Sequence, residues 1–472
     1  MTQQKKSKKI TERQILEQIT KSKVKWIRLQ FCNPFGLLHQ LSVPAKAITK
    51  ESFVKGFSLD GSSVLGFTDI NKSDILLVPD PNTFVILPDY FDTTNYDEKN
   101  QYLTKAARMF ANVNNGFDGE PFTRDPRYLA KNVEEFSKKM GFSKTYWAAE
   151  LEFFVFDKIM PNQKKNSLHI VSKEAPWISN NPDGKIHFKK GYYRDSPSDT
   201  LVNFRDEVCD VMQENFKIKT IAHHHEVATA GQSEIVLDYD GLVKMADSYV
   251  TGVKTIREVA SKRGMVASFN PKPIPNDNGS AVHINQSLWK KKNGRDFNAF
   301  YDPTEKYAEL SQIAYYYIGG LLHHAKALCA ITNPTADSYR RLIPGFEAPT
   351  NIAWGKMNRS VSVRIPAHHK KMPTNKRIEY RPPDPTSNIY LVETAILLAG
   401  LDGIKKKIQP PDPVDLDTYK LSKYEMKKFN IKKLPTSLLE AISSLKSDDE
   451  FLTPIIGDDF LDMYLSVLET QI

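Results

Sequence analysis

The first quarter of the chain carries short runs in which apolar and polar residues alternate. Three such runs lie at residues 24–31, 75–79 and 83–87, and clusters of Pro, Gly, Asn and Asp separate them. In residues 10–19 the apolar side chains recur instead at roughly helical spacing. The pattern therefore predicts one short surface helix followed by a small β-rich region.

Longer helical and strand-like segments alternate in the rest of the chain. The pattern predicts a strand over residues 145–156, amphipathic helices over 127–140 and 435–472, and one or two long helices over 303–331. Five residues would share one face of these last helices: Tyr307, Leu310, Ile313, Tyr317 and Leu321.

These segments predict an α+β protein with two domains. We expect an N-terminal helix and lysine-rich tail over residues 1–23, a small β domain over residues 24–115, and a large α+β domain over residues 120–472. The boundary would fall in the polar, Gly- and Asn-rich stretch near residues 114–120.

The composition is that of an ordinary globular protein. Of the 472 residues, 40% are hydrophobic and 26% are charged, and no apolar run approaches the ~20 residues that span a bilayer. No apolar segment follows the N-terminal lysines, so we expect no secretory signal and a cytoplasmic protein. The three cysteines lie far apart, which favours inert thiols over a disulfide framework. The net charge of +9 is compatible with binding to nucleic acid, to a membrane surface or to small anionic substrates. The positions of the charged residues in the sequence must decide among these three classes of partner.

Two carboxylates, Glu150 and Glu152, flank Leu151 in the predicted strand at residues 145–156. The two-residue period of a strand places both on one face. The two carboxylates repel each other unless a cation lies between them or they share a proton. By itself the pair fits a metal site and a solvent-facing edge strand equally well.

Two later segments add carboxylates and an imidazole. Glu226 and Glu234 follow three consecutive histidines, and buried carboxylates of this kind suit Mg²⁺ or Mn²⁺ better than zinc; a polar loop with a chance histidine run is the alternative. Further on, an Asn-Gly-Ser turn at residues 278–280 allows close approach to a ligand. His283 and Asn285 would then share one strand face, where a histidine is more often structural than a ligand.

Arginines are concentrated between residues 339 and 384. They are Arg340, Arg341, Arg359, Arg364, Arg377 and Arg381. Guanidinium groups bind phosphate and carboxylate bidentately, and a solvated basic face is the alternative. A nucleic-acid groove would instead need exposed aromatic residues among the basic ones and no carboxylate cluster. We therefore interpret the segments as a metal–nucleotide site with an anionic co-substrate, and we expect no nucleic acid and no membrane as partner.

Six motifs, in the same order, resemble those of the glutamine synthetases of the class I dodecameric type. Besides the segments above, residues 58–63 resemble that family's Asp-Gly-Ser-Ser loop, residues 333–349 resemble its substrate flap, and residues 358–360 and 377–381 resemble its later motifs. The similarity runs from about residue 24 to about residue 467. It implies a β-grasp N-terminal domain and an ATP-guanido-kinase-like catalytic domain with a curved antiparallel sheet.

The resemblance also implies metal ligands and substrate contacts. It assigns Glu152, Glu226 and Glu234 to a first divalent ion, Mg²⁺ or Mn²⁺, and Glu150, His283 and Glu379 to a second. Positions that hold glutamate or the phosphoryl group are Asn278, Gly279, Arg341, Arg359 and Arg381. Positions around ATP are His224, Asn285, Ser287, Arg359, Arg364 and Arg377. Asp60 and Ser63 match the loop that binds and deprotonates ammonium across a subunit boundary, and Glu347 matches the flap carboxylate that shields the intermediate from water.

The resemblance implies glutamate–ammonia ligation through γ-glutamyl phosphate. It also implies a hexameric ring that stacks to a dodecamer, and it allows small regulatory proteins as partners. Two alternatives are a ligase for amines larger than ammonia, of the γ-glutamyl-polyamine type, and a non-catalytic homologue that binds glutamate or nucleotide. The intact Asp60–Ser63 loop favours ammonium, and the six intact metal positions argue against a non-catalytic homologue.

Some positions depart from the family pattern. Asn285 and Ile221 stand where the family usually has His and Glu, which puts adenine contacts in doubt but leaves the metal positions intact. Tyr419 lacks the sequence context of the family's adenylylated tyrosine, so we expect an ordinary surface residue. The sequence ends soon after the helix expected near residues 458–468, without the family's apolar tail, from which we expect rings that separate more readily.

Overall fold

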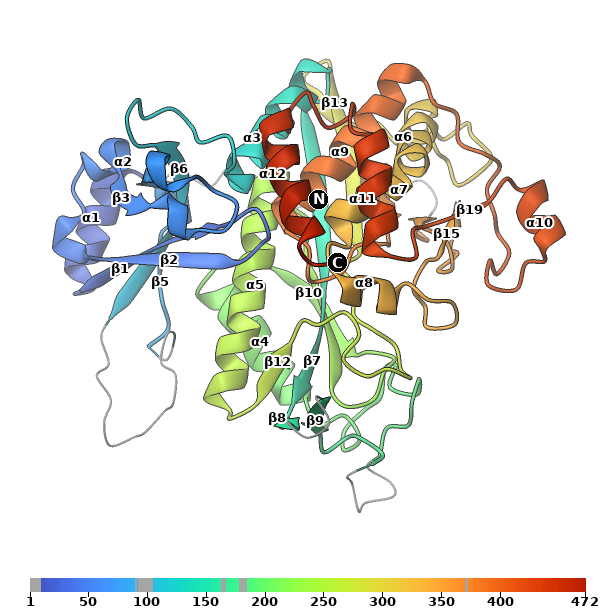
Figure 1. Cartoon of the computed structure of the whole chain (residues 1–472), viewed down its shortest axis with the longest axis horizontal. Helices are drawn as coiled ribbons and strands as arrows, with labels where there is room; N and C mark the ends of the chain where they lie inside the picture. The colour runs from blue at the N-terminus through green and yellow to red at the C-terminus, as the bar shows by residue number, and fades with distance from the viewer. Residues whose placement is uncertain (1–9, 90, 92–104, 163–166, 178–184, 370–371) are drawn as a thin grey trace. The chain divides into compact units, whose positions relative to one another are not determined.

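The computed structural model describes residues 10–89, 91, 105–162, 167–177, 185–369 and 372–472. The chain divides into two compact units, Met1–Tyr128 and Leu129–Ile472 (Figure 1). The lysine-rich tail expected at the start of the chain lies outside the described residues. Among the described helices, none combines the length and apolar character needed to cross a membrane.

The first unit is a six-stranded sheet with a helix packed on it. The strand order is β2-β1-β6-β4-β3, with β5 paired to β6, and β1 runs parallel to β6. The strands are β1 (Trp26–Cys32), β2 (Leu38–Pro44), β3 (Phe57–Asp60), β4 (Asp74–Pro79), β5 (Val85–Ile86) and β6 (Ala106–Asn115), and the helices are α1 (Glu12–Lys21) and α2 (Ser52–Lys55). Thr11 and Gln14 cap α1 reciprocally, and Ile15 and Ile19 pack into the core of the sheet. The predicted helix and the strands at 24–31 and 75–79 are confirmed.

The second unit contains a nine-stranded, mostly antiparallel sheet that positions the site. Its order is β10-β11-β7-β13-β18-β17-β16, with β12 paired to β7 and β14 paired to β13. The strands are β7 (Lys144–Phe156), β10 (Thr220–His225), β11 (Gln232–Leu237), β12 (Val266–Ser268), β13 (Ile284–Lys292), β14 (Arg295–Asn298), β16 (Trp354–Lys356), β17 (Val363–Ile365) and β18 (Ile378–Tyr380). Two small pairs stand apart: β8 (Lys158–Asn162) with β9 (Ser167–Val171), and β15 (Asn351–Ile352) with β19 (Lys432–Lys433).

The helices of this unit include several that pack against the sheet and others that pack against those helices. They are α3 (Pro126–Lys139), α4 (Val202–Glu214), α5 (Leu242–Lys262), α6 (Gln312–His323), α7 (Ala325–Thr332), α8 (Ala336–Arg341), α9 (Ile389–Lys406), α10 (Lys423–Lys428), α11 (Leu438–Ser447) and α12 (Asp458–Glu469). Helix α5 packs against β7 and α4, α6 packs against α9, and α11 packs against α7. Leu151 and Phe153 on the apolar face of β7 are fully buried. The α+β fold class and the predicted strand at 145–156 are confirmed.

The helical prediction for residues 303–331 needs correction at its start. Helix α6 begins only at Gln312, where the Ser311 side chain accepts a hydrogen bond from the Ala314 N–H. Before it, Ala308 and Glu309 adopt left-handed backbone angles of φ 53° and 51°, which no α-helix tolerates. The apolar spacing that suggested a helix is therefore partly that of a folded loop.

Candidate active site

Antiparallel pairing places like charges directly opposite each other in the large sheet. Glu234 of β11 lies opposite Glu152 of β7, which is the like-charge pair. On its other side, Glu234 lies opposite the imidazole of His224 on β10. Carboxylates that face each other across a strand pair destabilise a sheet. The register therefore indicates that a ligand of opposite charge belongs in this part of the sheet.

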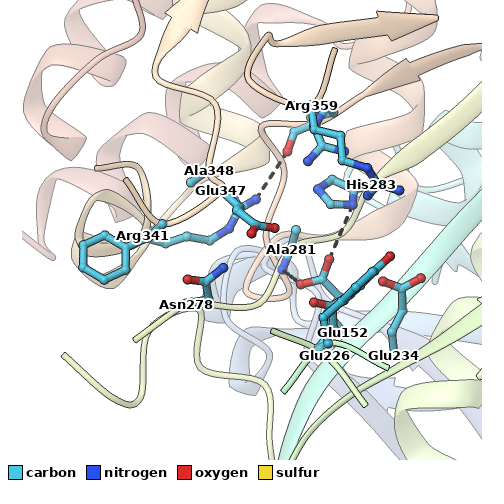
Figure 2. A pocket seen from close by; sticks show the side chains of 14 residues that line it. Glu152, Glu226, Glu234, Asn278, Ala281, His283, Arg341, Glu347, Ala348 and Arg359 are labelled. Atoms are coloured by element: carbon cyan, nitrogen blue, oxygen red, sulfur yellow. Dashed lines mark hydrogen bonds and ion pairs between the residues drawn. The ribbon is translucent and has the colours of Figure 1, made fainter. Parts of the chain in front are cut away.

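Five side chains form what we call the carboxylate cluster: Glu150, Glu152, Glu226, Glu234 and His283. Four of them, with Asn278, Arg341 and Glu347, line one pocket (Figure 2). His283 Nδ1 lies 2.8 Å from Glu150 Oε2 and 3.4 Å from Glu152 Oε1. His224 joins from the other side, with Nε2 3.6 Å from Glu234 Oε1 and Nδ1 3.9 Å from Glu226 Oε1.

Burial and mutual repulsion disfavour the charged forms of Glu152, Glu226 and Glu234. Burial and the charge of Glu226 raise the pKa of Glu152 to about 8. Burial also raises the pKa of Glu226 well above its usual value, with the Glu234 carboxylate adding to the effect. The pKa of Glu234 is raised well above its usual value by burial and by Glu150. A cation among them would reverse these shifts.

The donor set fits a hard divalent cation. His283 Nδ1 donates to a carboxylate oxygen of Glu150, so Nε2 carries the ring's lone pair, and this buried atom has no hydrogen-bond partner among the described residues. Burial and the positive charge of Arg381 hold the pKa of His283 well below its usual value, which keeps the imidazole neutral. Several carboxylate oxygens with one neutral imidazole suit Mg²⁺ or Mn²⁺.

Glu379 lies on β18 beside arginines. Its Oε2 accepts a hydrogen bond from Arg364 Nη1 at 2.6 Å, and its Oε1 pairs with Arg381 Nη1. Burial alone would raise the pKa of Glu379, but the charges of Arg381 and Arg364 lower it below its usual value. The predicted alternation of residues 377–381 on one strand face is thus present.

Asn285 connects the carboxylate cluster to the arginines. Its Nδ2 donates to Glu150 Oε1 at 3.1 Å, and its Oδ1 accepts from Arg377 Nε at 3.0 Å. His283 and Asn285 therefore reach the same carboxylate, as the predicted shared face requires. Ser287, two residues further along β13, accepts a hydrogen bond from Trp289 Nε1 at 3.0 Å. Of the residues predicted around ATP, His224 lies instead with Glu226 and Glu234.

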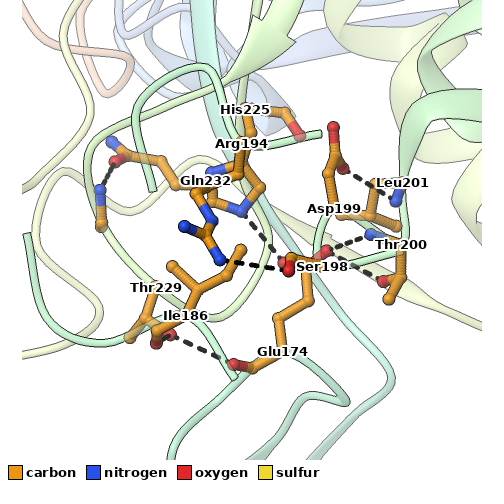
Figure 3. A network of polar contacts seen from close by, with 12 residues as sticks. Glu174, Ile186, Arg194, Ser198, Asp199, Thr200, Leu201, His225, Thr229 and Gln232 are labelled. Carbon is orange, nitrogen blue, oxygen red and sulfur yellow. Dashed lines mark hydrogen bonds and ion pairs between the residues drawn. The ribbon is translucent and has the colours of Figure 1, made fainter. Parts of the chain in front are cut away.

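A polar network around the buried Glu174 and His225 holds the segment that carries Glu226 and Glu234 (Figure 3). Glu174 accepts hydrogen bonds from the Thr200 N–H at 2.7 Å and the Thr200 hydroxyl at 2.9 Å. Its other oxygen lies 3.1 Å from His225 Nε2, and His225 Nδ1 donates to the Glu226 carbonyl at 2.7 Å. Sequence reasoning missed Glu174, because nothing in its local pattern marks a carboxylate that becomes buried through distant partners.

The tip of the flap, residues 344–348, borders the same pocket. Here Tyr419 corrects our expectation of an ordinary surface residue: it is half-buried, and its hydroxyl donates to the Ala348 carbonyl at 2.8 Å. Burial raises the pKa of Tyr419 to about 12. Distant packing, which the local sequence does not encode, decided its environment.

Asp60 and Ser63 belong to the first unit and form a compact turn. Asp60 Oδ1 accepts hydrogen bonds from the Ser62 N–H at 2.9 Å and the Ser62 hydroxyl at 2.5 Å, and its Oδ2 accepts from the Ser63 hydroxyl at 2.6 Å. These hydrogen bonds, that of the Ser62 side chain first, lower the pKa of the exposed Asp60. The carboxylate is therefore ionised at neutral pH.

Comparisons with known proteins agree with this architecture. Family models described as the glutamine synthetase β-grasp domain and catalytic domain match residues 23–115 and 123–472. The glutamine synthetase of Sulfolobus acidocaldarius is 44% identical over 465 residues, which cover 98% of this chain and 94% of that protein. That of Aquifex aeolicus is 40% identical over 471 residues, covering 98% and 96%. The solved structure of Plasmodium falciparum glutamine synthetase matches with a TM-score of 0.85 at 27% identity, covering 98% of this chain and 95% of that one.

Proposed function

Because the chain belongs to the glutamine synthetase family and catalyses ATP-dependent ligation of ammonia to glutamate, we propose which of its residues carry each part of that reaction. The observation that supports the assignment is the carboxylate cluster. Five ligand-type side chains, contributed by β7, β11 and the segments next to β10 and β13, converge where repulsion and burial disfavour the charged forms of Glu152, Glu226 and Glu234.

We propose two divalent cations in this arrangement. Glu152, Glu226 and Glu234 would hold the first, and Glu150, His283 and Glu379 the second. When bound, Mg²⁺ or Mn²⁺ supplies positive charge that stabilises the transferring phosphoryl group. The arginine partners of Glu379 keep its carboxylate ionised and therefore able to act as a ligand.

Glutamate would bind between the cluster and the arginines. Arg341 is 2% exposed, and its Nη1 donates to the Pro382 carbonyl at 2.7 Å, which fixes the orientation of its guanidinium group. Asn278 Oδ1 is buried and unpartnered among the described residues, an acceptor suited to the ammonium group of an amino acid. Gly279, Arg359 and Arg381 would complete the contacts to glutamate and the phosphoryl group, where fixed positive charge stabilises the transition state.

ATP would lie toward the strands on the arginine side of the sheet. Asn285, Ser287, Arg364 and Arg377 lie on or next to β13, β17 and β18. Arg359 lines the pocket of the carboxylate cluster and would reach the phosphates, whereas His224 lies with Glu226 and Glu234. The hydrogen bonds of Asn285 to Glu150 and Arg377 would couple the nucleotide contacts to the second metal position.

Ammonia attack needs a cation site, a proton acceptor and protection from water. The ionised Asp60, with Ser63, would attract ammonium, and a carboxylate would accept its proton as the nitrogen bonds to the glutamyl carbon. Glu347 on the flap would shield the acyl phosphate from hydrolysis. In this assignment, Asp60 and Ser63 act at the site of a neighbouring copy.

A shared site requires an assembly of identical chains. We infer a hexameric ring closed by heterologous contacts, stacked to a dodecamer, in the cytoplasm. Activity and particle mass should therefore fall together on dilution, which mass photometry and a parallel glutamine assay can follow. Full activity in a monomer would contradict the shared site.

The metal assignment is tested by titrating Mn²⁺ into the purified protein by calorimetry. Two sites per chain are expected for the wild type, and Glu226→Gln should weaken at least one of them about 10- to 100-fold or more, since it removes a direct ligand. Glu214→Gln removes an exposed carboxylate on α4 and serves as the control. Unchanged Mn²⁺ binding in Glu226→Gln would overturn the assignment.

A further inference from the structure

Two lysine side chains meet one aromatic ring at the flap tip. The ring of Phe346 is half-buried, and its centroid lies 3.6 Å from Lys272 Nζ and 3.9 Å from Lys189 Nζ. An ammonium group over an aromatic face within about 6 Å is attracted by the ring's quadrupole, more strongly when water is excluded. Lys272 is 7% exposed, so water is largely excluded from its ammonium group and its attraction to the Phe346 ring is the stronger of the two.

The two lysines are fixed by a common partner, Asp277. Lys272 Nζ donates to the Asp277 carbonyl, and the Lys189 N–H donates to Asp277 Oδ1 at 2.9 Å. Asp277 is fully buried, and its carboxylate also accepts from the N–H groups of Thr229 and Asn278 at 2.7 and 3.0 Å. The lysines are therefore anchored to the loop that carries the proposed glutamate ligand Asn278.

The backbone of the flap tip is tethered on both sides of Glu347. Lys189 Nζ donates to the Gly345 carbonyl at 2.9 Å, and the Tyr419 hydroxyl donates to the Ala348 carbonyl at 2.8 Å. Between these tethers Glu347 has a φ of 58°, a left-handed conformation that is uncommon for residues other than glycine. Such a conformation persists only where surrounding contacts impose it.

We propose that Lys189, Lys272 and Tyr419 are positioning residues that hold the flap closed, with Phe346 as the anchor clamped by the two lysines. This inference rests on the proposed role of Glu347 as a shield. The clamp sets how long the flap stays over the acyl phosphate, and hence the share of intermediate that meets ammonia and not water. Its chemical signature is the amount of glutamine formed per phosphate released.

The charge state of Lys272 gives the clamp a pH dependence. Burial lowers the pKa of Lys272 to about 8; the facing charged groups are Asp277, which raises the pKa, and Lys189 and Arg341, which lower it. Lys272 is therefore mostly cationic below about pH 8 and mostly neutral above it, and the attraction to Phe346 weakens as the pH rises through this range. An arginine at the same position would stay charged throughout.

The experiment compares glutamine and phosphate yields of the wild type, Lys272→Met and Lys272→Arg from pH 7 to 9. A lost cation–π contact should shift the closed–open equilibrium of the flap by about 3- to 30-fold. We expect Lys272→Met to form less glutamine per phosphate at pH 7, and Lys272→Arg to retain the wild-type yield. The wild-type yield should fall above pH 8 while that of Lys272→Arg does not. Lys290→Met, which removes a lysine 5.1 Å from the Phe142 ring, is the matched control.

Hydrogen exchange of the amides at residues 344–348 gives a readout that does not depend on turnover. It should be faster in Lys272→Met than in the wild type or Lys272→Arg. A Lys272→Met variant with wild-type yield and exchange would overturn the clamp. Glu347→Ala distinguishes a failure of the shielding role from a failure of the clamp. If Glu347→Ala keeps the wild-type yield of glutamine per phosphate, the shielding role is refuted. If Glu347→Ala lowers that yield and Lys272→Met does not, only the clamp is refuted.

Discussion

Substituting Glu174 should separate hydrogen-bond geometry from charge in the network behind the carboxylate cluster. Glu174 is 1% exposed and serves three groups: the N–H and hydroxyl of Thr200 and Nε2 of His225. Glu174→Ala leaves the buried His225 Nε2 without its partner, whereas the exposed Thr200 can bond to water instead. An unsatisfied buried group costs about 1–3 kcal/mol, and each of the two lost Thr200 hydrogen bonds costs about 0.5–1.5 kcal/mol, which gives about 2–6 kcal/mol in total.

Glu174→Gln should cost much less, for a reason that the geometry supplies. His225 Nδ1 faces the Glu226 carbonyl, which only accepts, so Nδ1 carries a proton. With that proton on Nδ1, Nε2 can accept a hydrogen bond from the new amide. The amide oxygen can still accept from Thr200. We expect a loss below about 1.5 kcal/mol, the net worth of an ordinary hydrogen bond.

The assay is thermal unfolding at fixed protein concentration without ligands. At roughly 2 °C per kcal/mol, Glu174→Ala should lower the midpoint by about 4–12 °C and Glu174→Gln by about 3 °C or less. Glu214→Ala, on the exposed face of α4, should leave it unchanged. Equal damage by Ala and Gln would refute the hydrogen-bond argument, and a wild-type midpoint for Glu174→Ala would refute the bracing role altogether.

Three further outcomes test the site itself. Glu347→Ala should keep glutamate-dependent phosphate release but lower glutamine per phosphate, measured in one reaction; equal losses of both would point to misfolding. Glu226→Gln should raise the thermal midpoint of the metal-free protein, because it removes a buried repelling carboxylate, and should reduce the additional rise on adding Mn²⁺; a normal rise with Mn²⁺ would contradict a ligand role. Gly279→Ala should raise the KM for glutamate severalfold, because its Cβ would lie 2.1 Å from the Pro271 carbonyl oxygen and 3.2 Å from Arg341 Cγ; an unchanged KM would mean that Gly279 does not shape the glutamate site.

The sequence predicted those parts of the protein that local patterns encode. Alternation of apolar and polar residues located the strand that became β7 to within one residue at its start, because one face of that strand is buried and the other carries Glu150 and Glu152. The family motifs identified the enzyme and its activity, and the comparisons confirm both. The same local rule failed before α6, because a loop can show helical spacing when tertiary contacts, and not a helix, bury its apolar residues.

Only the tertiary structure decided which side chains meet. The sequence separates Lys189, Lys272 and Phe346 by tens of residues, and no periodicity relates them, yet the fold places both ammonium groups over one ring. Tyr419 likewise carries no local mark of its tether to Ala348. Residue type sets which chemical groups a chain carries. Spacing sets which of them share a face of one strand or helix, because the periods of strands and helices extend over only a few residues. Burial, pKa and the partners of a polar group depend on segments distant in sequence, so they appear only when the chain is folded.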